Sequence, residues 1–127
     1  MDGAIDPEIQ ETTGQILSAA FAVSSALGHG FLEGVYRKAL LHELMLRGLR
    51  PREEVHFRVR YRDADCGSYI ADLVVDGRVI VELKAVAALL PAHRAQLLNY
   101  LRASGLRAGL LLNFGTPKLT YARVLNG

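Results

Sequence analysis

The segment Arg78–Lys84 constrains the fold more than any other part of this sequence. It runs Arg-Val-Ile-Val-Glu-Leu-Lys, so Glu82 and Lys84 are the only charges beyond its first residue. Side chains alternate along a β-strand, which puts Ile80, Glu82 and Lys84 on one face, with the two charges about 7 Å apart. Such an apolar strand normally lies inside a domain, where charges are costly unless paired or bound to metal. A solvated ion pair on a surface strand is the alternative.

Length and composition predict a folded, mildly basic protein. The chain has 127 residues, half of them hydrophobic, and a formal net charge of +2. We expect one domain over residues 1–127, with 1–7 as a flexible tail. The charge permits nucleic-acid binding without requiring it. Cys66 is the only cysteine, which excludes an internal disulfide and favours a reduced thiol. We find no signal peptide and no apolar run that could span a bilayer, so we expect a cytoplasmic protein without membrane association.

The spacing of apolar residues changes from a helical period to a period of two near residue 51. Apolar residues recur every three or four positions over about 8–27 and again over 32–44, which predicts two helices separated by Gly28-His29-Gly30. From 55 to 61 the period becomes two, which predicts a strand with one buried and one wet face. Further along we expect strands at 69–75 and 78–84, a helix at 91–103, a central strand at 106–113 and, as a further candidate, an edge strand at 119–124.

The resulting order, α-α-β-β-β-α-β-(β), predicts an α/β (α+β) domain with a mixed sheet flanked by helices. Asp72 lies on the strand before Glu82, ten residues earlier. Two carboxylates that converge on one point suit a hard cation such as Mg²⁺, which can activate water and neutralise phosphoryl charge. The hairpin loop decides whether they converge. With a two-residue Asp76-Gly77 loop they would face opposite sides of the sheet, which would exclude the metal site. We predict a three-residue loop with Gly77 left-handed, or a bulge, which restores a shared face.

The choice of lysine at position 84 is informative, because the chain has twelve arginines and only three lysines. Lysine carries a compact point charge, whereas arginine carries a planar fork. A lysine near a metal-bound water can orient that water or stabilise developing negative charge.

Polar residues on two of the predicted helices are further candidates. His93, Gln96 and Tyr100 follow each other at i, i+3 and i+7 and share one helix face. The alternative is an interfacial helix whose tyrosine hydroxyl is satisfied by a hydrogen bond. Glu33 begins the second helix, where it could simply interact with the helix dipole.

Three arginines alternate along the first predicted strand. Arg58, Arg60 and Arg62 could contact a nucleic-acid backbone, or they could be the solvated face of that strand. No basic segment interleaved with aromatic residues is visible that would support sequence readout.

Together these motifs resemble the GxxExxY protein family, which is assigned to the PD-(D/E)XK nuclease superfamily. The resemblance covers roughly residues 8–126 and implies a restriction-endonuclease-like core. The motifs that carry it, in the family's order, are Gly30-x-x-Glu33-x-x-Tyr36, Ala71-Asp72-Leu73-Val74, the segment 79–86, His93-x-x-Gln96-Leu97-Leu98-x-Tyr100-Leu101 and Leu111-Leu112-Asn113-Phe114.

The resemblance also implies roles. Asp72 and Glu82 would be metal ligands, with the backbone carbonyl of Leu83 as a third. Lys84 would be the catalytic lysine, and Glu33 the helix-borne acid that completes the cluster.

Gln96 and Tyr100 resemble the QxxxY element of RecB-like nucleases, which lies beside the active site and helps to position substrate. His93 is an added positioning candidate on the same helix.

We therefore expect a Mg²⁺- or Mn²⁺-dependent nuclease that hydrolyses DNA or RNA. The alternative is a non-catalytic module that keeps the fold and binds nucleic acid or protein, because fold does not fix function. The small size favours a homodimer or a protein partner for targeting. A glycosidase pair of Glu33 and Glu82 is disfavoured, because it leaves Asp72 and Lys84 unexplained and lacks aromatic platforms for a sugar.

Overall fold

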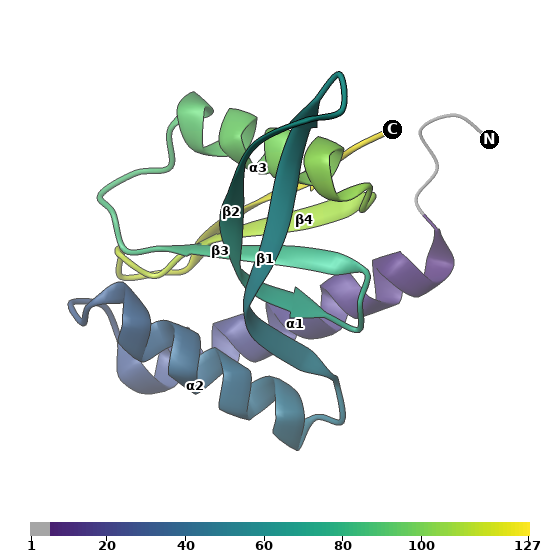
Figure 1. Cartoon of the computed structure of the whole chain (residues 1–127). Coiled ribbons are helices and arrows are strands. Elements are labelled where there is room, and N and C mark those ends of the chain that lie inside the picture. Colours follow the sequence, from purple (N-terminus) through teal and green to yellow (C-terminus); the bar gives the residue numbers. More distant parts are fainter. Residues whose placement is uncertain (1–5) are drawn as a thin grey trace.

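A five-stranded sheet forms the middle layer of the part of the chain that the structure, a computed structural model, describes, residues 6–127 (Figure 1). The elements follow the predicted order, and the candidate last strand is present. In chain order they are α1 Pro7–Leu27, α2 Glu33–Leu46, β1 Pro51–Tyr61, β2 Ala64–Val75, β3 Val79–Lys84, α3 Pro91–Ser104, β4 Ala108–Asn113 and β5 Thr120–Leu125.

The strands lie in the order β1-β2-β3-β4-β5, and the mixed sheet is covered on both faces. β3 and β4 are parallel and are joined through α3, whereas the other neighbours are antiparallel. Val79, Val81 and Leu83 of β3 pack with the core formed by α1 and α2. Ile80 packs with Leu97 and other residues on the α3 side. Glu82 and Lys84 follow Ile80 by strand alternation, so their side chains belong to the α3 face.

Helix α1 begins where its sequence supplies a cap. The Asp6 carboxylate accepts a hydrogen bond from the Glu8 N–H at 2.8 Å, and Pro7 occupies the first turn. Asp6 and Pro7 therefore belong to the helix start, and the expected tail over 1–7 is wrong for these two residues. The rest of that tail, residues 1–5, lies outside the described residues.

The β2–β3 hairpin has the register that a shared carboxylate face requires. Val75 pairs with Val79, which leaves a three-residue loop of Asp76, Gly77 and Arg78. Gly77 has φ +65°, the left-handed conformation that glycine adopts without strain. Continuing this register past Leu73, which pairs with Val81, places Asp72 opposite Glu82. The predicted three-residue loop is confirmed.

The β1–β2 hairpin is longer than the sequence pattern indicated. β1 begins at Pro51 and β2 at Ala64, because Arg62 and Asp63 form a two-residue turn with positive φ values of 48° and 66°. The outer half of this hairpin extends past α3 (Figure 1). The predicted buried face therefore ends early: Val59 and Tyr61 are exposed, because no layer covers the sheet there.

Asn113, at the end of β4, connects β4 to the loop that follows Lys84. Its side chain is fully buried and makes three hydrogen bonds of 3.0 Å: it accepts from the N–H groups of Val86 and Gly115 and donates to the Val86 carbonyl. Gly115 packs so tightly on this loop that a Cβ there would overlap the backbone of Val86. The position of the chain after Lys84 therefore depends on one buried amide.

Replacing this amide tests its importance. Asn113→Leu leaves three buried backbone groups without partners, so we expect the free energy of unfolding to fall by about 2–4 kcal/mol. Urea denaturation measures the change. Asn99→Leu, at an exposed position on α3, is the control and should change stability by less than about 0.5 kcal/mol. Equal losses in the two variants would contradict this assignment.

Candidate active site

Asp72 and Glu82 lie where β2 separates from β3. The backbone pairing of the two strands ends at Leu73 and Val81. Beyond that point, side-chain carboxylates take the place of backbone carbonyls as hydrogen-bond acceptors. Glu82 Oε2 accepts a hydrogen bond from the Asp72 N–H at 3.0 Å, and Asp72 Oδ2 accepts one from the Leu83 N–H at 2.8 Å. Because a carboxylate has two oxygens, each side chain keeps another oxygen for a ligand.

Burial makes the negative charge of this pair unfavourable. Glu82 is only 7% exposed, and burial raises its pKa to about 8, with a further contribution from the charge of Asp72. Burial also raises the pKa of Asp72, although the hydrogen bond from Leu83 and the charge of Arg37 oppose the rise. Two carboxylates held together under these conditions form a site that a bound cation would relieve.

Glu33 and Lys84 complete the charged group that the sequence predicted. Glu33 is the first residue of α2; partial burial raises its pKa, and the charge of Asp72 adds to the rise. Lys84 lies close enough to lower the pKa of Glu33, Asp72 and Glu82. Charged side chains from α2, β2 and β3 thus lie within electrostatic range of one another.

Tyr36 explains how Glu33 reaches this position. Its buried hydroxyl donates to the Gly28 carbonyl at 2.7 Å and accepts from the Phe31 N–H at 3.2 Å. Its ring stacks on Phe114 with the centroids 4.8 Å apart. These contacts fix the loop before α2 and therefore the position of Glu33. Tyr36 belongs to the motif Gly30-x-x-Glu33-x-x-Tyr36, but the spacing of that motif did not predict these contacts.

Tyr100 lies beside the carboxylates and belongs to an aromatic stack. Its ring is 3.7 Å from that of Tyr69, centroid to centroid, and Tyr69 in turn stacks on Phe57 at 5.3 Å. The Tyr69 hydroxyl donates to the Tyr100 carbonyl at 2.6 Å. Burial raises the pKa of Tyr100, and the charges of Glu82 and Asp72 raise it further. The predicted placement of Tyr100 next to the acidic pair therefore agrees with the geometry.

The other two residues of the predicted α3 face have different surroundings. His93 Nδ1 accepts a hydrogen bond from the Leu90 N–H at 3.0 Å, so the imidazole caps the start of α3. This gives His93 a structural reason to be there. Gln96 is exposed one turn further along and forms no side-chain hydrogen bond with the residues that the structure describes.

The three arginines of the first predicted strand do not share one environment. Arg58 forms an ion pair with Asp65 of β2. The register of β1 shifts between Arg58 and Arg60. Arg62 lies in the turn, with its guanidinium 5.5 Å from the centre of the Tyr61 ring. The expectation that all three line one wet strand face is wrong, because a bulge and a turn interrupt the strand.

Arg37 is a member of this neighbourhood that sequence reasoning missed. Its charge lowers the pKa of both Glu33 and Asp72. Its Nε lies 3.5 Å from Glu53 Oε2 and makes no hydrogen bond. The available signal was its position four residues after Glu33, one helical turn along the same face of α2.

The chemistry of the donor set fits a hard divalent cation. Asp72 and Glu82 offer carboxylate oxygens, which are hard donors and suit Mg²⁺ or Mn²⁺ better than softer metals. Within residues 6–127, no group of three or more His, Cys, Asp or Glu side chains is arranged to hold a metal ion. Among the described residues, no third carboxylate therefore joins Asp72 and Glu82 in this arrangement, and the role of Glu33 as a further ligand stays a prediction from the sequence.

A mixed sheet between helices, with an acidic pair and a lysine at adjoining strands, defines a restriction-endonuclease-like α+β fold. A family model described as the PD-(D/E)XK nuclease superfamily matches residues 10–124. The chain therefore belongs to the PD-(D/E)XK nuclease superfamily. Membership of the narrower GxxExxY family stays a prediction.

Comparison with solved structures supports the fold. The crystal structure of SSO0001 matches with a TM-score of 0.60 and 18% sequence identity, over 92% of this chain and 58% of that chain. The chain thus spans little more than half the length of that relative. The curated proteins include no significant match. No helix among residues 6–127 is both long and apolar enough to cross a membrane.

The raised pKa of Glu82 predicts how stability depends on pH in the absence of metal. As pH rises from the ordinary value of 4.5 to about 8, the unfolded chain loses the Glu82 proton while the folded chain keeps it. The free energy of unfolding therefore falls across this window and levels off above it. Glu82→Gln removes the titrating group and with it this fall in stability. We therefore expect the free energy of unfolding of the variant to exceed that of the wild type by about 2–4 kcal/mol at pH 8, and to differ little from it at pH 4.5.

Urea denaturation in a chelating buffer measures this difference. Glu11→Gln, an exposed change on α1, is the matched control and should follow the wild type at every pH. A Glu82→Gln variant with the same pH slope as the wild type would rule out a buried, protonated Glu82.

Proposed function

We propose that this protein is a divalent-metal-dependent nuclease that hydrolyses phosphodiester bonds of DNA or RNA. The observation that carries the proposal is the pair of buried carboxylates, Asp72 and Glu82, which backbone N–H groups of Asp72 and Leu83 hold where β2 and β3 separate. Burial makes the negative charge of this pair unfavourable, and a bound cation would offset that cost. Membership of the nuclease superfamily supports the same reaction class.

In this proposal Mg²⁺ or Mn²⁺ is held by Asp72, Glu82 and the Leu83 carbonyl, with Glu33 as the ligand or water-holding group from α2. A divalent cation supplies Lewis acidity and positive charge at the phosphoryl group. The backbone hydrogen bonds to Asp72 and Glu82 fix the orientation of both carboxylates before any ligand binds.

Lys84 supplies the mobile positive charge of the site. It follows Glu82 on the α3 face of β3, and its carbonyl accepts a hydrogen bond from the Phe114 N–H at 2.8 Å, which fixes the backbone. From there the ammonium group orients the attacking water and offsets negative charge that develops on the phosphate. Tyr100 and Gln96 position the substrate from α3, and His93 supports that helix at its start. A homodimer or a protein partner for targeting stays a prediction.

Cleavage assays test the proposal. We expect metal-dependent hydrolysis of single- or double-stranded DNA or RNA by the wild type. Lys84→Ala and Asp72→Asn should each lower kcat by at least about 100-fold, because each removes a charge that acts on the transition state. Lys118→Ala, at an exposed lysine between β4 and β5, is the control and should retain wild-type activity. Wild-type protein without metal-dependent cleavage of any of these substrates would favour the non-catalytic binding module.

Calorimetry separates metal binding from turnover. We expect Mn²⁺ to bind the wild type and to raise its melting temperature, because binding to the folded state alone stabilises it. Glu82→Gln and Asp72→Asn should each abolish the heat of binding and the shift, whereas Glu11→Gln should preserve both. Equal Mn²⁺ binding by all variants would place the metal elsewhere.

A further inference from the structure

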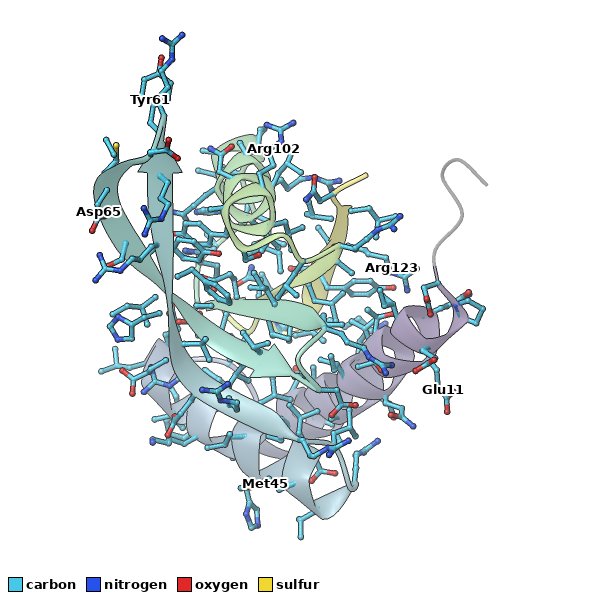
Figure 2. All side chains as sticks on the ribbon, turned by 45° about the vertical axis from the view of Figure 1, so that its right-hand side comes forward. Glu11, Met45, Tyr61, Asp65, Arg102 and Arg123 are labelled. Atoms are coloured by element: carbon cyan, nitrogen blue, oxygen red, sulfur yellow. The ribbon has the colours of Figure 1, made fainter. Side chains whose placement is uncertain are left out.

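A groove lies between the outer half of the β1–β2 hairpin and α3. Its volume is about 580 Å³. Figure 2 shows Arg102 on α3 at the same end of the molecule as Tyr61 at the hairpin tip. The side chains that matter for its chemistry are Arg58, Arg60, Tyr69, Asn99, Tyr100 and Arg102.

The groove carries positive charge beside an acidic site. Arg58 is paired with Asp65. Arg60 and Arg102 are exposed and form no ion pair with any acidic side chain among residues 6–127. Tyr100 lines the groove, and the charges of Glu82 and Asp72 act on its hydroxyl, so the groove borders the acidic site. An anionic chain bound along the arginines would therefore pass close to the carboxylates.

We propose that this groove binds a single-stranded segment of nucleic acid and leads it to Asp72 and Glu82, an inference that rests on the proposed nuclease function. Grooves that bind single strands combine arginines that follow the backbone with aromatic side chains that contact bases. Here Arg60 and Arg102 supply the first, and Tyr100 the second, because the ring of Tyr69 already stacks on both Phe57 and Tyr100. A duplex keeps its base faces stacked inside, so it could use the arginines but not Tyr100.

The sequence could not show this groove, because its residues come from separate segments. Arg60 lies on β1 and Arg102 on α3, so no window of the sequence contains both. The contact between β1 and α3, through the stack of Phe57, Tyr69 and Tyr100, brings them together.

Fluorescence anisotropy without divalent cations tests the groove. The probes are labelled oligothymidylate, oligouridylate and a DNA duplex of equal length. We expect the wild type to bind single strands more tightly than the duplex, and Arg60→Ala/Arg102→Ala to weaken single-strand binding by at least about tenfold. The slope of log K against log salt should fall by about 1.4, since each lost phosphate contact contributes about 0.7.

Arg123→Ala is the matched control, because Arg123 is an exposed arginine on β5, at the other edge of the sheet (Figure 2). If the double variant is unstable, Arg102→Glu alone tests the same groove, because it changes a single exposed position on α3 and should also weaken single-strand binding. Wild-type affinity in both groove variants, or tighter binding of the duplex, overturns the proposal. Equal affinity for oligothymidylate and oligouridylate supports recognition through phosphate contacts and base stacking. A higher affinity for one of them identifies DNA or RNA as the preferred single strand.

The assay separates the two proposals, because it involves no cleavage. Failure of the groove variants to weaken binding leaves metal-dependent cleavage by the wild type intact. Loss of single-strand binding in these variants, together with a wild type that cleaves nothing, would reject the nuclease and keep the groove.

Discussion

The site depends on two hydrogen bonds across the end of the β2–β3 pairing: the Glu82 carboxylate accepts from the Asp72 N–H, and the Asp72 carboxylate accepts from the Leu83 N–H. Each carboxylate satisfies a backbone N–H that the parting strands can no longer pair. An unpaired buried N–H would cost about as much as a lost hydrogen bond, so the separation of β2 and β3 requires acceptors at this point. The two residues that make the separation of β2 and β3 possible are therefore the same two that form the acidic site. A substitution of either one affects both the local fold and the chemistry of the site.

Neighbouring elements are held to this centre by single buried polar groups. Tyr36 fixes the loop before α2, and Asn113 fixes the loop after β3. Both make several hydrogen bonds within a few residues of the charged cluster. The cluster itself is unfavourable, because burial raises the pKa of Glu82 and Asp72. Stability supplied by these surrounding contacts keeps the carboxylates close in the absence of a cation.

Periodicity predicted the helices because each buries one regular face, and the central strands β3 and β4 were recognisable as apolar runs because both of their faces are buried. The requirement that Asp72 and Glu82 share a face predicted a three-residue loop with Gly77 left-handed or a bulge, and the structure has the three-residue loop. Periodicity failed for the outer β1–β2 hairpin, where Val59 and Tyr61 alternate with polar residues but no layer covers them. It missed Arg37, and it could not assemble the groove, because Arg60 and Arg102 meet only through tertiary contacts. His93 shared the expected helix face, yet its hydrogen bond to the backbone gives it a local structural role.

The outer edge of β1 has a consequence for self-association. β1 is an edge strand of eleven residues, and long edges can pair with strands of other molecules. Here positive φ at Glu54 and the register shift near Arg58 interrupt the regular spacing of its free backbone groups. The arginines add repulsion between two such edges. The irregular, basic edge of β1 thus disfavours extension of the sheet at this side by a strand of another molecule.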